Sequence, residues 1–190
     1  MIACGRSSEK PRQKNEGRLD MTSPDETEAL VREVRIAARP ETVFAFFTDP
    51  EKLVRWKAIS AELEPRPGGI YRANINGTSI ARGEYLEVVP FTRIVFTWGW
   101  EGDASPLPPG STTVEVSFSA DGEATVVRLR HLGLPADQRE AHAKGWDHYL
   151  PRLAIAAEGR DAGPDSHRDQ PMGRYLLDLG EQGGPSHEIL

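Results

Sequence analysis

The feature that most constrains the fold is a run of short β-rich stretches that ends in one long helical pattern. Between residues 58 and 132, stretches of β-branched and aromatic residues recur at regular spacing and are separated by turn signals, which is typical of an antiparallel meander. Asn76-Gly77 is the strongest of these signals, because both residues tolerate the left-handed backbone of a two-residue hairpin. The sequence therefore predicts six strands, at 58–64, 70–75, 80–89, 93–100, 113–118 and 125–132.

One more strand and two short helices are expected before this meander. The stretch 31–36 is rich in β-branched residues and predicts a strand. Pro40 suits the first turn of a helix. Asp49 and Pro50 repeat this start signal, with the aspartate as the cap. They predict a second short helix that ends near Trp56.

The long helical pattern covers residues 135–158. Its apolar residues share one face at helical spacing; they are Trp146, Leu150, Leu153 and Ala157. Gly145 and Pro151 interrupt the pattern, and a proline inside a helix removes one backbone hydrogen bond. We therefore expect a kink near Asp147.

Together these elements predict an α+β fold in which a curved seven-stranded antiparallel sheet carries two short helices and one long C-terminal helix. One face of such a sheet needs cover, and only the C-terminal helix is long enough to lie across it. Because a single helix face cannot fill the concave side of a strongly curved sheet, we expect an internal cavity. Such cavities are mostly apolar and hold a few polar groups.

The two ends of the chain differ in composition from this domain, which we place at 31–158. Residues 1–30 are expected to form a disordered N-terminal arm, since 6–20 are almost entirely charged or polar. Met1 and Met21 both remain candidate starts. Residues 159–190 are rich in glycine and proline and predict a flexible tail, in which 175–179 could dock as one helical turn.

Charge and composition exclude several classes of protein. The net charge of -6 disfavours nucleic acid as a partner. The longest apolar runs, such as 43–47, are five residues long, far short of the roughly 20 that a membrane helix needs. The single cysteine, Cys4, excludes an internal disulfide or a cysteine-clustered zinc site. No export or lipidation signal precedes it, so we expect a cytoplasmic protein.

Several segments, taken in order, are similar to a known superfamily. The segment 36–44 (IAARPETVF), followed by 48–53 (TDPEKL) and Trp56, resembles the opening of START and Bet v 1-like (SRPBCC) proteins. Four further segments resemble the branch of this superfamily that is named for activators of the heat-shock chaperone ATPase. They are Pro67-Gly68-Gly69, Gly83-Glu84-Tyr85 with Pro90, 94–98 (IVFTW), and Gly145-Trp146 with Leu150 and Leu153. The resemblance covers residues 31–158 and implies a helix-grip fold around a hydrophobic cavity. It does not extend to chaperone activation, because the eukaryotic activator has an additional N-terminal domain for that role.

Aromatic residues are the main candidates for a ligand site. Along 94–100 the even positions share one face of the strand, so Phe96, Trp98 and Trp100 are expected to face the long helix. Core packing and a cavity wall are both open interpretations of these rings. The residues expected to contact a ligand are Trp56, Tyr71, Phe96, Trp98, Trp100, Phe118, His131, Trp146 and Leu150.

Histidines are the remaining candidates for chemistry. His131 shares a face with Val127 and Leu129, so it is expected inside, as a core histidine, a polar ligand anchor or an acid–base group. On the long helix, His142, Asp147 and His148 lack the spacing of a metal site and are interpreted as a solvated face. We predict no catalytic residue, metal or cofactor.

The leading hypothesis is that the protein binds an unidentified, mainly hydrophobic small molecule in an internal cavity, without catalysis. The first alternative is an enzyme of the polyketide-cyclase kind, in which His131 or a nearby carboxylate moves a proton. The second is a chaperone-associated or regulatory module that uses the outer face of the sheet or the tail to bind a protein partner or to form a homodimer.

Overall fold

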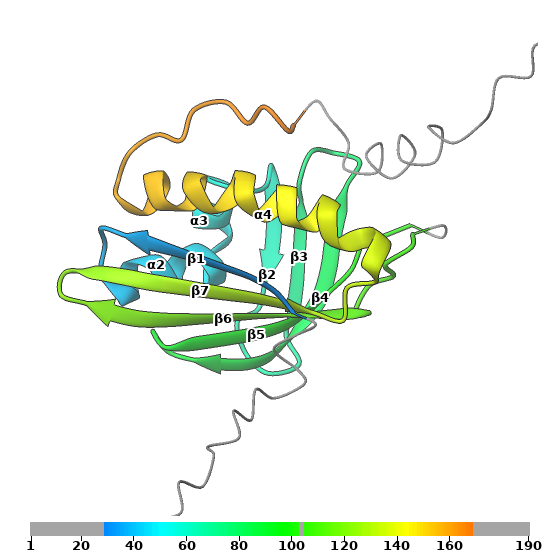
Figure 1. Cartoon of the computed structure of the whole chain (residues 1–190), viewed down its shortest axis with the longest axis horizontal. Coiled ribbons are helices and arrows are strands. Elements are labelled where there is room, and N and C mark those ends of the chain that lie inside the picture. The colour runs from blue at the N-terminus through cyan, green and yellow to red at the C-terminus, as the bar shows by residue number, and fades with distance from the viewer. Residues whose placement is uncertain (1–28, 103–104, 169–190) are drawn as a thin grey trace, which may run out of the picture.

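The computed structural model describes residues 29–102 and 105–168 (Figure 1). Its elements, in chain order, are β1 (Leu30–Ile36), α2 (Pro40–Thr48), α3 (Pro50–Leu53), β2 (Ser60–Leu63), β3 (Ile70–Asn74), β4 (Ile80–Val89), β5 (Arg93–Trp98), β6 (Thr112–Asp121), β7 (Ala124–Leu132) and α4 (Ala136–Ala157). The predicted α+β fold, with a seven-stranded antiparallel sheet, short N-terminal helices and a long C-terminal helix, is confirmed.

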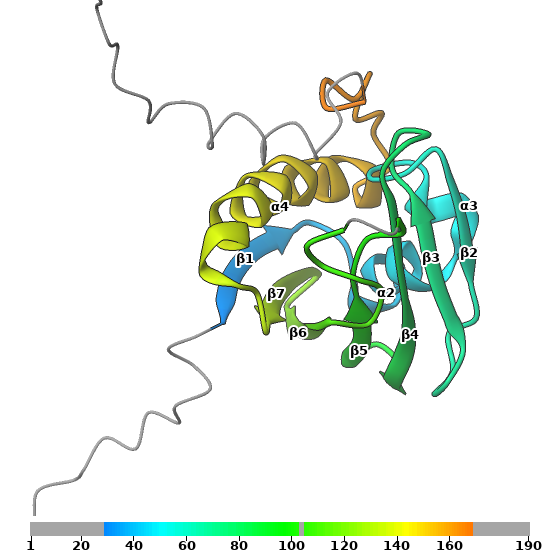
Figure 2. The same cartoon turned by 90° about the vertical axis from the view of Figure 1, so that its right-hand side faces the viewer.

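The sheet is a meander whose edge is completed by the first strand. Its order is β1-β7-β6-β5-β4-β3-β2, and all neighbouring strands are antiparallel. β1 pairs with β7 in a register that sets Val34 opposite Val127. The two ends of the meander are therefore β1 and β2, and the sheet curves between them (Figure 2).

α4 lies across the concave side of the sheet (Figures 1 and 2). It contacts β1 and α2, and Asp147 accepts hydrogen bonds from the Arg32 guanidinium at 2.5 and 3.0 Å. The helix is continuous through Pro151, whose ring is exposed, so the missing backbone bond lies away from the core. A kink near Asp147 stays a prediction.

α2 and α3 close one end of the curved sheet. The Phe44 and Phe47 rings both meet the Phe118 ring edge to face, at 5.6 and 5.5 Å. Asp49 caps α3 as predicted, because its Oδ1 accepts the Glu51 N–H. α3 ends at Leu53, earlier than the sequence predicted, and the residues up to Trp56 form turns.

Glycine allows two close backbone contacts beside β5. A Cβ at Gly83 would overlap the Thr97 carbonyl, and one at Gly99 would overlap the Pro108 carbonyl. The predicted strand 93–100 ends at Trp98, and beyond that residue the pairing with β4 is reduced to an isolated bridge between Ala81 and Trp100. There the Trp100 N–H donates to the Leu107 carbonyl at 2.7 Å, which brings the segment 105–111 against the end of β5.

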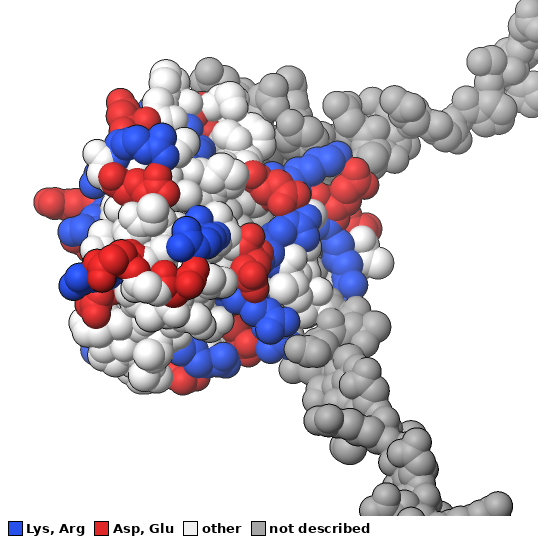
Figure 3. Space-filling view, turned by 60° about the vertical axis from the view of Figure 1, so that its left-hand side comes forward, with Lys and Arg blue, Asp and Glu red and all other residues white. Residues whose placement is uncertain are grey.

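Charges on the surface are mixed in sign. On the face shown in Figure 3, basic and acidic side chains lie interleaved. Many are paired, as Arg35 of β1 is with Asp121 of β6, and Arg39 before α2 is with Glu123 in the turn between β6 and β7. Among the described helices, none is long and apolar enough to cross a bilayer. The predicted N-terminal arm up to residue 28 and the segment 175–179 lie outside the described residues.

Candidate functional site

The structure buries eight of the nine residues that were predicted to contact a ligand, and Trp100 is half-buried. Phe118 lies apart from the others, against Phe44 and Phe47 of α2. Leu150 belongs to the hydrophobic core under α4. Four of the remaining rings contact Trp98: Tyr71, Trp100, His131 and Trp146. Phe96 stacks on Tyr71, and Trp56 contacts Phe47.

Trp98 is the centre of this gathering. Its ring centroid lies 5.2 Å from that of Trp100, 6.1 Å from that of Trp146 and 6.1 Å from that of His131. Tyr71 contacts it from β3 and also stacks on Phe96, with ring centroids 4.2 Å apart. β3, β5, β7 and α4 therefore all contribute rings to one site.

His131 is a fully buried, neutral member of this site. Its Nδ1 accepts the indole N–H of Trp146 at 3.2 Å. Nε2 must then carry the proton, and it donates to Thr112 Oγ1 at 2.9 Å, which in turn donates to the Trp98 carbonyl. Burial, and after it the nearby His142 and Lys57, hold the pKa of His131 well below its usual value. Both ring nitrogens are occupied, which matches the core-histidine alternative.

His142 was interpreted from the sequence as part of a solvated face, and this was wrong. It is 7% exposed and contacts the His131 ring at 5.4 Å. Its Nε2 accepts the Trp100 indole N–H at 3.3 Å, and its Nδ1 donates to the Gln138 carbonyl at 2.8 Å. The signal was present, because His142 lies one helical turn before Trp146 on the same face.

Lys57 was not singled out from the sequence. It follows α3, is 3% exposed, and its Nζ lies 4.2 Å from the ring centroids of both Trp98 and Trp146. The Trp56 ring is 5.8 Å away. Burial lowers the pKa of the Lys57 ammonium to about 7, because an uncompensated charge is costly in an apolar interior. The two indole faces offset part of that cost.

We call this group the aromatic–basic cluster; it comprises Trp56, Lys57, Tyr71, Trp98, Trp100, Thr112, His131, Gln138, His142 and Trp146. Two of its buried polar atoms have no hydrogen-bond partner among the described residues: the indole nitrogen of Trp98 and Oε1 of Gln138. Buried polar atoms are nearly always paired. The cluster therefore presents one unused donor and one unused acceptor among its aromatic rings.

The cluster is basic in character. It contains Lys57, His131 and His142 and no acidic residue. Asp137, whose carboxylate accepts from Gln138 Nε2 at 3.3 Å, is itself exposed. Over the part of the chain that the structure describes, no group of three or more histidine, cysteine or acidic side chains is placed to hold a metal ion. The cluster can therefore donate hydrogen bonds to an acceptor group of a ligand, and its indole rings can stack on the apolar part of that ligand.

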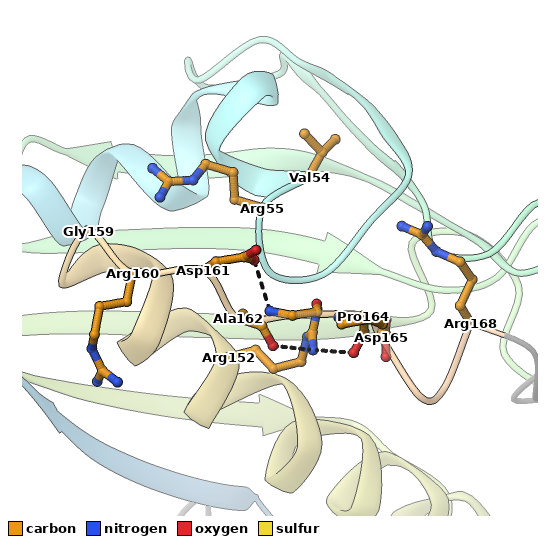
Figure 4. A pocket seen from close by; sticks show the side chains of 11 residues that line it. Val54, Arg55, Arg152, Gly159, Arg160, Asp161, Ala162, Pro164, Asp165 and Arg168 are labelled. Carbon is orange, nitrogen blue, oxygen red and sulfur yellow. Dashed lines mark hydrogen bonds between the residues drawn. The ribbon is translucent and has the colours of Figure 1, made fainter.

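A surface pocket of about 410 Å³ lies beside the C-terminal end of α4 (Figure 4). Arg152 lies beneath it and donates to the carbonyls of Trp56, Ala162, Gly163 and Pro164, at 2.9–3.1 Å. These bonds occupy the guanidinium and attach the segment 159–168 to the helix. The pocket contains none of the nine predicted residues.

A second surface pocket, of about 440 Å³, lies beside Gly83 and Thr97. Arg82 and Glu84 of β4 line it. It too contains none of the nine predicted residues. Neither surface pocket is therefore the expected ligand site.

Comparison with known proteins agrees with this architecture. The chain is 26% identical over 151 residues to the human protein "Activator of 90 kDa heat shock protein ATPase homolog 1", an alignment that covers 73% of this chain and 43% of the human one. The chain thus spans less than half the length of that relative. A solution structure of an AHSA1-like protein from Rhizobium etli is 46% identical, with a TM-score of 0.59, over 73% of this chain and 86% of that one.

A second similar structure, the Aha1 dimer from Colwellia psychrerythraea, is 19% identical, with a TM-score of 0.59, over 68% of this chain and 96% of that one; at this identity it shows the fold alone. The model of the family described as "Activator of Hsp90 ATPase homolog 1-like protein" matches residues 37–158, which is nearly the whole described domain. The chain therefore belongs to the Activator of Hsp90 ATPase homolog 1-like family, within the START/Bet v 1-like (SRPBCC) superfamily.

Proposed function

We propose that this domain binds a small, largely apolar molecule at the aromatic–basic cluster, between the sheet and α4. The observation that carries the proposal is the indole N–H of Trp98, which is buried among aromatic rings and has no acceptor among the described residues. An unpaired buried donor costs about 1–3 kcal/mol. A ligand with an acceptor atom would satisfy it, and the surrounding rings would bury its apolar part.

The enzyme alternative has less support from the geometry. Acid–base catalysis by His131 or His142 needs a ring nitrogen that is free to exchange a proton with a substrate. Both nitrogens of both rings are engaged in hydrogen bonds. The two histidines are better suited to hold the indoles of Trp100 and Trp146 in place.

The first test is native mass spectrometry of the purified full chain, which is expected to show a co-purified small molecule. Titration with apolar compounds provides the second readout, because all four tryptophans of the chain belong to the cluster and their emission will report occupancy. Trp98→Phe keeps a ring but removes the N–H donor. We expect it to weaken binding by about tenfold, the equivalent of one hydrogen bond.

Leu86→Ala is the matched control, because this side chain is exposed on β4 and the substitution is expected to leave binding unchanged. Equal affinity in wild type and Trp98→Phe would place the ligand elsewhere. A chain that carries no small molecule and whose emission responds to no compound in a broad apolar set would end the proposal.

A further inference from the structure

Lys57 is the least expected residue of the cluster. An ammonium group has three N–H donors, and the two indole faces that flank Nζ at 4.2 Å can accept at most two of them. No carboxylate of the described residues lies within ion-pair distance of Nζ, and none shifts its titration. Lysine is almost never this deeply buried without an anionic partner.

The titratable groups around Lys57 do not supply the missing negative charge either. Lys57 acts on two titratable groups, His131 of β7 and His142 of α4, and its charge adds to burial in lowering the pKa of both. Tyr71 of β3 also contacts Trp98, and burial raises the pKa of its hydroxyl. These three titratable groups are therefore neutral or basic, and Trp98 contributes a donor without an acceptor among the described residues.

A site of this kind is complementary to one class of ligand. We infer that the molecule bound at the aromatic–basic cluster carries a carboxylate, which pairs with the Lys57 ammonium and accepts the Trp98 indole N–H, while its apolar body stacks on the tryptophans. This inference rests on the proposed function. A carboxylate has acceptors only, so its oxygens suit both the Lys57 ammonium and the Trp98 indole N–H, and a hydrogen bond to a charged group is about twice as strong as a neutral one.

Matched pairs of ligands will isolate the contribution of the carboxylate. We would titrate the full chain by calorimetry with 2-naphthylacetate, 4-phenylbutyrate and dodecanoate, and with the primary amide of each. The acid and its amide have the same apolar body, so any difference in affinity reports the charge. At pH 6 we expect at least one acid to bind tenfold or more tightly than its amide.

Lys57→Met removes the ammonium but keeps an unbranched side chain of similar length. It is expected to abolish the preference for the acid and to leave binding of the amide within about twofold. Lys144→Met is the matched control: this lysine is exposed and paired with Glu140 at 2.8 Å, on the outer face of α4. It makes the same chemical change away from the cluster, and the preference is expected to persist in it.

Binding of the acid should also depend on pH. Above pH 7 the free chain must take up a proton at Lys57 to bind the carboxylate, so the affinity of the acid is expected to fall by up to about tenfold per pH unit. The affinity of the amide should not change. In ¹³C-lysine NMR, one of the five lysine ε-methylene signals, the one lost in Lys57→Met, should have its midpoint shifted upward by one pH unit or more by the acid and not by the amide.

The outcomes separate the two proposals. If acids and amides bind equally and Lys57→Met has no effect, this inference is overturned while the binding function stands. If no member of either series binds and no molecule co-purifies, the proposed function fails, and this inference fails with it. A preference for the acid that survives Lys57→Met would assign the anion to another group.

Discussion

Trp146 on α4 donates its indole N–H to Nδ1 of His131 on β7, over 3.2 Å. This is a buried hydrogen bond between the helix and the sheet, and it sets the histidine tautomer. With Nδ1 as acceptor, Nε2–H donates to Thr112, which donates to the backbone of β5 at Trp98. One polar chain thus runs from α4 through β7 and β6 to the strand that carries the central tryptophan.

Trp146→Phe tests this chain. The substitution keeps most of the apolar surface but leaves Nδ1 of His131 buried without a donor, which costs about 1–3 kcal/mol in addition to the lost packing. We expect the free energy of unfolding, measured by urea denaturation at pH 7, to fall by about 2–4 kcal/mol.

Trp100→Phe is the comparison for this prediction. It removes the equivalent donor to His142, but the Trp100 ring is only half-buried, so water can replace the bond more easily. We expect the free energy of unfolding of Trp100→Phe to fall by about 1 kcal/mol. ¹H–¹⁵N NMR of the histidine rings should show a changed protonation pattern for His131 only in Trp146→Phe. Equal losses in the two variants would contradict the role assigned to the His131 bond.

The fold was predictable because its elements are bounded by strong local signals. β4 extends from residue 80 to residue 89 as predicted, since Asn76-Gly77 precedes it and Pro90 follows it. β6 is longer than predicted, up to Asp121, because its last residues are exposed and carry no apolar alternation. The end of β5 was missed for the opposite reason: its apolar alternation continues to Trp100, but the ladder with β6 ends at Trp98, and the Trp100 N–H donates to the Leu107 carbonyl in the loop.

The candidate site was predictable only in its apolar part. Rings at period 2 on β5 and at helical spacing on α4 identify the surfaces that face each other. Lys57 follows a four-residue helix, and its burial depends on where β5 and α4 place their indoles. The residue pattern of its own segment contains no information about that tertiary arrangement, and lysine side chains are almost always found at the protein surface.

Lys57→Met should stabilise the fold at neutral pH. The pKa of Lys57 is lowered by burial from 10.5 to about 7 in the folded chain. Between these values the unfolded chain binds more protons than the folded one, so the stability of wild type rises with pH. Below pH 7 both states are protonated and the penalty is fully present.

At about 1.4 kcal/mol per pH unit, the rise for wild type between pH 7 and pH 9.5 is about 3 kcal/mol after allowing for partial protonation. Lys57→Met should lack this rise. The measurement is urea denaturation of both proteins over this range, with Lys144→Met as the control that follows wild type. Parallel stability curves for wild type and Lys57→Met would show that Lys57 titrates as an exposed lysine does.

Gly83→Ala should destabilise the fold strongly. A Cβ at this position would overlap the backbone carbonyl of Thr97 on the neighbouring strand, and backbone cannot move aside as a flexible side chain can. We expect a loss of about 3 kcal/mol or more in chemical denaturation. Glu84→Ala, at the adjacent exposed position of β4, should change stability by less than about 0.5 kcal/mol. A tolerated alanine at 83 would mean that β4 and β5 lie further apart than described.

Arg152→Lys should release the segment 159–168 from α4 without unfolding the domain. The planar guanidinium donates to four carbonyls that lie in different directions. The lysine side chain is shorter and ends in a single nitrogen, so it cannot make the same set of hydrogen bonds. We expect hydrogen exchange in residues 161–165 to accelerate at least tenfold, while the protection of β6 and β7 is unchanged. Arg160→Lys is the control, because Arg160 is exposed and pairs with its close neighbour in the chain, Glu158. Unchanged exchange in Arg152→Lys would show that the stacked rings of His148 and His167, 3.7 Å apart, hold the segment without the arginine.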